Sequence, residues 1–278
     1  MNRLGKRISK KILLYVVLIV GALVAFFPFY WMVSSALKPS NEIIQYPPEI
    51  IPNSITFEHF QYVFQTMNVP RAFMNSMIVS VTTVVLNALL SGMVAYALVK
   101  LRFPGKKLLF GIVMAFMMVP FQLLIVPLFM TMTTLNLIGT YSGMILPSVV
   151  SSFSIFLLRQ NMLTLPNDYI EAALIDGSGH FRIFFKIIIP MIIPAFVTVI
   201  LTNFFWSWNN YLWPMMISVQ HDEIATMQVA IDRYRTLQDM KWGPTMAACT
   251  LTALPIVVVY LILQRQFIES VATSGIKG

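Results

Sequence analysis

The segment Glu171-Ala172-Ala173-Leu174-Ile175-Asp176-Gly177 lies in a short charged loop between two long uncharged stretches, 108–158 and 187–221. About 20 predominantly apolar residues are enough for a helix to cross the hydrocarbon core of a bilayer. Asp, Glu, Lys and Arg are likewise missing from three further stretches: 12–37, 72–99 and 242–264. The loop therefore separates membrane-crossing segments, and the sequence predicts an all-α polytopic membrane protein.

Composition supports this class. The 278 residues are 58% hydrophobic and 11% charged, with a mean hydropathy of +0.76, and these values are typical of integral membrane proteins. The 16 prolines and 12 glycines agree with it, because both residues are tolerated in membrane helices. The single cysteine, Cys249, has no partner for an internal disulfide and is interpreted as a small apolar helix residue.

The number of spans depends on the stretch 108–158, which is long enough for two helices. Its polar patch at 131–140, which contains Gly139, is the natural break. We therefore predict six transmembrane helices in one transmembrane domain, 1–278. Their approximate bounds are 12–36, 72–99, 108–130, 141–159, 188–217 and 243–264, with a cytoplasmic loop at about 160–187.

Orientation follows from Lys and Arg, which are retained on the cytoplasmic side of a membrane. Most of the 19 Lys and Arg residues fall in segments that the alternating spans place on one side of the membrane: Arg3, Lys6, Arg7, Lys10, Lys11, Lys100, Arg102, Lys106, Lys107, Arg159, Arg182, Lys186, Arg265 and Lys277. The opposite side receives Lys38, Arg71, Arg233, Arg235 and Lys241. The pattern predicts cytoplasmic N- and C-termini in a bacterial inner membrane, and it explains the +8 net charge without a nucleic-acid partner.

The sequence offers little for catalysis. Its three histidines, His59, His180 and His221, are far apart and form no metal-binding helix motif. Gly105-Lys106 resembles part of a phosphate loop, but Lys100 stands where the first glycine is needed. We therefore expect no catalytic residue, no metal and no cofactor on this chain. The uncharged spans also argue against a proton-coupled transporter that works alone.

Amide side chains within the spans are the candidates for a polar path: Asn75, Asn87, Gln122, Asn203, Asn209 and Asn210. Interhelical hydrogen bonds are the alternative for each. Asn203, Trp206 and Asn210 have the spacing of one helical face, and amides beside indole rings suit a sugar. The candidate substrate path is Gln122, Asn203, Trp206, Asn209 and Asn210. The alternative for the tryptophans, including Trp213, is an interfacial belt.

The loop itself predicts a short helix. Asp168 and Glu171 have capping-box spacing, and Gly177 supplies the left-handed residue that ends a helix. A second helix is expected over 181–189, ended by Pro190. The small side chains of Ala172 and Ala173 would let the first helix enter a groove of another protein. An ordinary amphipathic connector between spans is the alternative.

Glu171-Ala172-Ala173-x-x-Asp176-Gly177, followed by Ile189-Pro190, resembles the EAA loop of bacterial ABC importer permeases. Several other motifs resemble the smaller, maltose-type permease subunit of carbohydrate importers: Asn75-Ser76, Ala95-Tyr96-Ala97, Phe103-Pro104-Gly105, Phe156-Leu157-Leu158-Arg159-Gln160, Trp208-Asn209-Asn210-Tyr211-Leu212-Trp213-Pro214 and Gly275-Ile276-Lys277-Gly278. The resemblance extends over nearly the whole chain from about residue 20. One departure is Glu269-Ser270-Val271, where the family often has a glycine.

The resemblance implies the type I ABC importer permease fold and a role as half of a sugar translocation path, with an oligosaccharide as substrate. The partners it implies are a second homologous permease in a heterodimer, two ATP-binding cassette subunits, an extracytoplasmic solute-binding protein, the sugar and membrane lipid. ATP and Mg²⁺ would be used by the partner ATPase. The coupling residues would be Glu171, Ala172, Ala173, Asp176 and Gly177.

The external loop at about 219–244 would face the binding protein. Its mixed charge, from Asp222, Glu223, Asp232, Arg233, Arg235, Asp239 and Lys241, suits a transient polar contact. A plain solvated loop is the alternative. Two other functions use the same six helices: a secondary transporter or channel for a small polar solute without an ATPase, and a membrane scaffold without a path.

Overall fold

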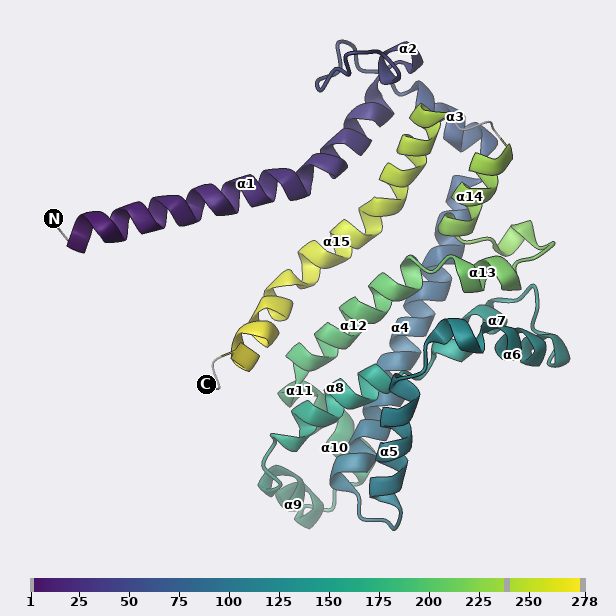
Figure 1. Cartoon of the computed structure of the whole chain (residues 1–278). Helices are drawn as coiled ribbons and strands as arrows, with labels where there is room; N and C mark the ends of the chain where they lie inside the picture. The colour runs from purple at the N-terminus through teal and green to yellow at the C-terminus, as the bar shows by residue number, and fades with distance from the viewer. Residues whose placement is uncertain (1–2, 238–240, 276–278) are drawn as a thin grey trace. The chain divides into compact units, whose positions relative to one another are not determined.

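The computed structural model describes residues 3–237 and 241–275, and no β-strand occurs in these two ranges. Asp239 and residues 276–278 of the C-terminal motif lie outside the described residues. Figure 1 labels the helices along the chain. The chain divides into two compact units. The first comprises Met1–Val69 and Ile231–Ala253, and the second comprises Pro70–Ala230 and Leu254–Gly278.

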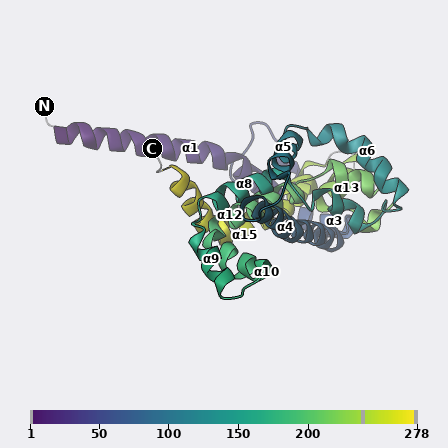
Figure 2. The ribbon, with the colours of Figure 1, turned by 90° about the horizontal axis from the view of Figure 1, so that it is seen from below.

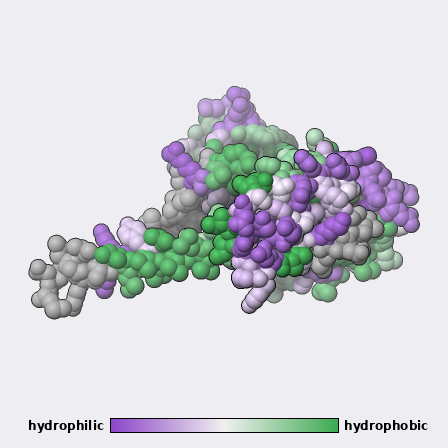
Figure 3. All heavy atoms as spheres, turned by 90° about the horizontal axis from the view of Figure 1, so that it is seen from above, coloured by the Kyte–Doolittle hydropathy of each residue, from purple (hydrophilic) through white to green (hydrophobic). Residues whose placement is uncertain are grey.

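The first unit is built around the end of a long apolar helix. Its elements are α1 (Arg3–Leu37), α2 (Ser40–Ile43), α3 (Glu58–Thr66), the end of α14 (Met227–Leu237) and the start of α15 (Trp242–Gly275). Large apolar side chains are exposed along α1, and they form the green extension in Figure 3. At the other end of α1, the carbonyl oxygen of buried Lys38 lies 2.8 Å from Nε2 of buried His59.

The second unit holds the remaining helices, and its own core lies between α4, α8 and the segments that follow. Its elements are α4 (Val69–Lys100), α5 (Lys106–Met117), α6 (Phe121–Thr134), α7 (Tyr141–Ile145), η1 (Leu146–Ser148), α8 (Ser152–Leu163), α9 (Asp168–Ile175), α10 (His180–Ile183), the π-helical turn η2 (Phe184–Ile188), α11 (Ile189–Met191), α12 (Ile193–Trp208), α13 (Leu212–Ile217) and η3 (Asp222–Ile224).

Within the described residues, three helices are long and apolar enough to cross a membrane: Lys10–Leu37, Val69–Lys100 and Trp242–Arg265. Three more candidates are bent pairs: Lys106–Met117 with Phe121–Thr134 at 102°, Tyr141–Ser148 with Ser152–Leu163 at 44°, and His180–Met191 with Ile193–Trp208 at 87°. These three helices cover the predicted spans 12–36, 72–99 and 243–264. Six spans result only if each bent pair counts as one.

The helices over the other three predicted spans, 108–130, 141–159 and 188–217, are broken rather than continuous. The first breaks at 118–120, where Pro120 lacks an N–H and restricts Val119 before it to extended conformations. The second breaks after a short 3₁₀ turn that contains Pro147. The third breaks at Ile192, whose φ of −123° and ψ of 32° are not helical.

The side-chain amides of Asn75 and Asn87 form hydrogen bonds between segments of the second unit. Nδ2 of Asn75 donates to the carbonyls of Glu223 (3.0 Å) and Ala225 (2.9 Å), and its Oδ1 accepts from the Tyr141 hydroxyl at 2.6 Å. Nδ2 of Asn87, which is fully buried, donates to the Ser148 carbonyl at 3.0 Å. The alternative of structural hydrogen bonding therefore describes both residues.

Candidate functional site

Helix α9 lies at the end of the second unit that also carries the end of α4 and the start of α5 (Figure 1). It contains the predicted coupling residues Glu171, Ala172 and Ala173, and Asp176 and Gly177 follow its end. It begins at Asp168 after Asn167, and no side chain caps it. The predicted capping box is wrong, because Asp168 is already inside the helix and a capping residue must precede it. The Asn167 amide oxygen instead accepts from Nζ of Lys100 at 2.8 Å.

The predicted end of this helix at Gly177 is confirmed. Gly177 has a φ of 76°, a left-handed conformation that glycine adopts without strain. Its N–H donates to the Leu174 carbonyl at 3.0 Å, and the Ser178 N–H donates to the Ala173 carbonyl at 2.9 Å. These two bonds form a Schellman motif, which satisfies carbonyls that the helix end would leave unpaired.

The two alanines of α9 lie on different faces of the helix. Ala173 is 8% exposed and packs with Ile170 in the core of the second unit, whereas Ala172 and Glu171 are exposed. The hypothesis that both alanines enter a groove of another protein is therefore wrong for Ala173, which anchors the helix to its own chain. Ile175 is an apolar residue that is 86% exposed, and the sequence did not identify it as part of the candidate site.

More apolar surface surrounds this exposed face. Tyr169, Leu174 and Phe181 are 54%, 43% and 69% exposed, and they lie on α9 and α10 at the end viewed in Figure 2. We define the exposed coupling face as Tyr169, Glu171, Ala172, Leu174, Ile175, Asp176 and Phe181. A protruding helix that carries an apolar centre and carboxylates is suited to insertion into a partner protein.

The helix that follows Gly177 is longer than predicted. The helix from His180 passes through the π-helical turn η2 and through Pro190, and it ends at Met191. The prediction that Pro190 ends it is wrong. A π-helical turn directly before a proline accommodates the missing N–H and the ring, which would clash in a regular α-helix.

The candidate substrate residues have different environments. Nδ2 of Asn203 donates to Ser154 Oγ at 3.0 Å and to the Val199 carbonyl at 2.8 Å, so this amide joins α12 to α8. Trp206 is 71% exposed on the same helix. Gln122 is exposed in the first turn of α6 and makes no hydrogen bond with the described part of the chain.

The predicted shared face of Asn203, Trp206 and Asn210 is wrong for Asn210. Helix α12 ends at Trp208, with Asn209 as its cap, so Asn210 lies beyond the helix. Oδ1 of Asn210 accepts from the Trp213 N–H at 3.4 Å, and Nδ2 of Asn209 donates to the Phe205 carbonyl at 2.9 Å. Periodicity could not locate this helix end, because no proline or glycine marks it.

The tryptophans also differ from one another. Trp208 and Trp213 are each 1% exposed, and the Trp213 indole donates to the Gly143 carbonyl at 3.1 Å. An interfacial belt is therefore the wrong interpretation of Trp213, which is a core residue of the second unit. Trp206 is the exposed indole of α12.

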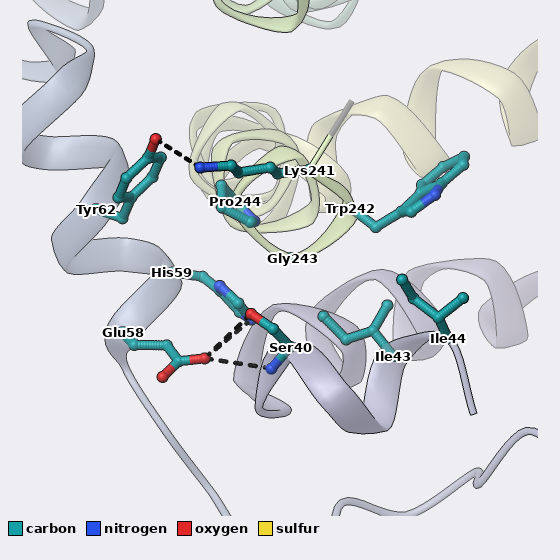
Figure 4. A pocket seen from close by; sticks show the side chains of 10 residues that line it. All are labelled: Ser40, Ile43, Ile44, Glu58, His59, Tyr62, Lys241, Trp242, Gly243 and Pro244. Carbon is teal, nitrogen blue, oxygen red and sulfur yellow. Dashed lines mark hydrogen bonds and ion pairs between the residues drawn. The ribbon is translucent and has the colours of Figure 1, made fainter. Parts of the chain in front are cut away.

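A separate pocket of about 490 Å³ lies in the first unit (Figure 4). Its wall includes Trp242, Tyr62 and Lys241, whose Nζ is 3.2 Å from the Tyr62 hydroxyl. Glu58 closes another side and accepts from the Ser40 hydroxyl at 3.4 Å. The Tyr62 ring also packs edge-on against the ring of Tyr234. Burial is the main cause that raises the pKa of Tyr234 to about 12, and the nearby Tyr62 is the second cause. These polar groups hold the pocket wall together.

The described part of the segment 219–244 is not a plain loop. It contains η3 and the helix α14, and His221 Nδ1 lies 2.9 Å from Glu223 Oε1. Hydrogen bonding by the Glu223 backbone N–H and by His221 lowers the pKa of Glu223. Within the described residues, no group of three or more His, Cys, Asp or Glu side chains is placed to hold a metal ion.

Long apolar helices joined by an exposed, anchored loop helix are typical of membrane transport subunits. The family model described as "Binding-protein-dependent transport system inner membrane component" matches residues 85–272, and the chain belongs to this family. It is an inner-membrane permease subunit of the ABC importer class, as the sequence motifs predict.

Three curated relatives are similar over most of this chain. The arabinooligosaccharides transport system permease protein AraQ of Halalkalibacterium halodurans is 33% identical and covers 98% of this chain and 100% of the relative. The diacetylchitobiose uptake system permease protein NgcG of Streptomyces coelicolor is 33% identical over 93% and 86%. The sn-glycerol-3-phosphate transport system permease protein UgpE of Yersinia pestis is 31% identical over 94% and 95%.

Two solved structures share the fold. A chain of a bacterial ABC transporter involved in import of the acidic polysaccharide alginate superposes with a TM-score of 0.84 at 23% identity, covering 96% of this chain and 99% of that one. A chain of a bacterial alginate ABC transporter in complex with an alginate pentasaccharide-bound periplasmic protein gives 0.64 at 17% identity, covering 94% and 96%. The fold is therefore that of an ABC importer permease.

Proposed function

We propose that this chain is the permease subunit of an ATP-driven oligosaccharide importer and that α9 is its coupling helix. The observation that carries the proposal is the division of α9 into two faces. Ile170 and Ala173 fix one face in the core of the second unit, while the exposed coupling face remains available to a partner. A helix that is anchored on one side and exposed on the other can transmit a displacement from the partner to the membrane helices.

The connection from α9 into the membrane helices is direct. Nζ of Lys100, the last residue of α4, donates to the Leu165 carbonyl at 3.0 Å and to Asn167 at 2.8 Å, immediately before α9. Charge-assisted hydrogen bonds of this kind are stronger than neutral ones. Movement of α9 by an ATPase would therefore pull on the end of α4, and differential affinity of ATP for two ATPase states would drive the change.

In the proposed complex this chain forms half of the translocation path beside a second, homologous permease. Two ATP-binding cassette subunits use ATP and Mg²⁺ on the cytoplasmic side, and an extracytoplasmic binding protein delivers the substrate. The segment 219–244 is the proposed contact with that protein. An oligosaccharide is the substrate class that suits the printed names of the arabinooligosaccharides and diacetylchitobiose relatives.

The coupling role is tested by Glu171→Lys in the purified importer. Reversing this exposed charge should reduce ATPase association and sugar-stimulated ATP hydrolysis at least about tenfold, a size appropriate to the loss of a charged contact in an interface. Gln160→Lys is the matched control, because it adds a positive charge at an exposed position on the same loop side but outside α9. Unchanged association and hydrolysis in Glu171→Lys would overturn the assignment.

The substrate residues need a different test. Trp206→Ala removes an exposed indole, and Asn210→Ala removes one weak backbone contact, so both variants should assemble normally. If they line the path, sugar uptake falls while basal ATP hydrolysis and complex assembly persist. Normal uptake kinetics in both variants would remove them from the proposed path. Uptake without any ATPase would instead favour a secondary transporter or channel.

A further inference from the structure

Arg159, near the end of α8, has an unusual environment. Its guanidinium carbon lies 3.8 Å from the centroid of the Phe110 ring, and its Nε atom is buried. None of the described residues accepts a hydrogen bond from this guanidinium. A guanidinium carries five N–H donors, and leaving buried donors unpaired is costly. Arg159 is half-buried, so part of its side chain remains accessible to an acceptor from outside the chain.

A second cation lies on the same side. Lys106 is one helical turn before Phe110 on α5, and the charge of Arg159 acts on it. Nζ of Lys106 donates to the carbonyls of Val99 (2.8 Å) and Leu101 (3.0 Å), which fixes it at the end of α4. No carboxylate of the described residues lies within 4.0 Å of either cation. Two neighbouring positive charges without a counter-ion favour an anion.

The surface beside these cations is apolar. Leu109, Ile112 and Phe116 recur on one face of α5 and are 48%, 43% and 60% exposed. An acyl chain is the complementary partner for such a stripe in a membrane protein, and a basic pocket at its cytoplasmic end is typical of sites for lipid head groups.

We infer that Arg159 and Lys106 bind the phosphate of an anionic phospholipid of the cytoplasmic leaflet, with its acyl chain along Leu109, Ile112 and Phe116. The inference goes beyond the proposed function but uses the same membrane orientation. Arg159 would hydrogen-bond the phosphate oxygens, for which a planar guanidinium is well suited, while stacked on Phe110. Lys106 would supply the second charge from its fixed position.

The test measures lipid retained by the assembled importer in nanodiscs that contain equal phosphatidylglycerol and phosphatidylcholine, using native mass spectrometry. The wild type should retain phosphatidylglycerol preferentially. Arg159→Gln should lower this retention about fivefold, the effect of losing one basic contact worth about 1 kcal/mol. Lys107→Gln is the matched control, since it removes the same charge at the adjacent, exposed position. Arg159→Lys keeps the charge and should keep most of the lipid.

Several outcomes would overturn the inference. These are equal retention of both lipids by the wild type, equal losses in Arg159→Gln and Lys107→Gln, and a loss in Arg159→Lys as large as in Arg159→Gln. Displacement of the lipid by millimolar inorganic phosphate would assign the site to free phosphate. Loss of ATPase association with unchanged lipid would assign the guanidinium to a protein partner. Glu171→Lys should leave lipid retention unchanged, so failure of the coupling proposal is separately visible.

Discussion

Gly139 is a position where the backbone and the packing both require glycine. Its φ is 74°, and a Cβ built there would overlap the imidazole of His221. We predict that Gly139→Ala lowers the free energy of unfolding by about 1–3 kcal/mol, because a residue with a side chain is strained in this conformation. The change should appear as a lower melting temperature of the detergent-purified protein.

Gly111 provides the control. It lies within α5, and a Cβ there meets nothing within 4 Å. Gly111→Ala should keep or raise stability, since alanine favours a helix by about 1 kcal/mol over glycine. Equal destabilisation by both substitutions would contradict the geometry at Gly139.

Asn75 joins three segments of the second unit through its side chain. Asn75→Ala would leave the carbonyls of Glu223 and Ala225 and the hydroxyl of Tyr141 without this partner. We predict a loss of roughly 2 kcal/mol or more, measured as thermal stability, since each buried unpaired group costs about 1–3 kcal/mol. Asn161→Ala, which loses only a bond to its own helix at Leu157, should be close to neutral. A neutral Asn75→Ala would show that the network is dispensable.

At the residue scale, the sequence predicted the role of Gly177 but not the contacts of Asn167 and Arg159. The left-handed Gly177 was predictable, because few residues other than glycine end a helix in that way. The role of Asn167 was not, because Lys100, 67 residues away in sequence, engages it. The environment of the Arg159 guanidinium likewise depends on Phe110 from another helix. Long-range contacts of this kind leave no local signal.

Helix α9 allows its two faces to be tested with one type of substitution. Ala173→Leu places a larger side chain in the core of the second unit and should destabilise the docking of α9 by about 1–3 kcal/mol. Ala172→Leu changes only the exposed coupling face and should leave the fold intact while reducing ATPase association. Hydrogen exchange of residues 168–177 distinguishes them: faster exchange is expected in Ala173→Leu alone. Faster exchange in both would contradict the two-faced arrangement.

The helices themselves were predictable where apolar stretches are uninterrupted. Hydropathy predicted apolar spans at the positions of α1, α4 and α15, and α1 and α15 extend beyond those spans. It did not give the bends at 118–120 and 192, because a proline in a membrane helix is compatible with either a kink or a break. Packing between neighbouring helices decides between these outcomes, and hydropathy does not contain that information.

The whole chain has a testable orientation. In a Cys249→Ser background, Ile50→Cys should react with a membrane-impermeant thiol reagent in cells whose inner membrane is intact, because Ile50 is exposed on the predicted external side. Ile175→Cys should react only after the inner membrane is permeabilised. Labelling in the reverse order would contradict the charge-based orientation, and labelling of both before permeabilisation would contradict a span between them.

At the scale of the molecule, sequence motifs and charge distribution predicted the family and a membrane location, both of which the comparisons confirm. The substrate path was beyond such reasoning, because Asn203 and Asn210 find partners within the chain. In the proposed complex of two permeases, the path would also depend on residues of the second permease. The exposed apolar length of α1 is consistent with a chain whose surface is completed by lipid and partner subunits.

The central claim is that α9 contacts an ATPase, and site-directed crosslinking tests it most directly. Ile175→Cys in the Cys249→Ser background, probed with a short bifunctional thiol reagent in the assembled importer, should crosslink to a single cysteine introduced along the ATPase cleft, and the yield should change with ATP. Arg102→Cys, exposed in another loop of the same predicted side, serves as the control. Absence of a crosslink from Ile175→Cys, or an equal ATP-independent yield from both positions, would contradict the account.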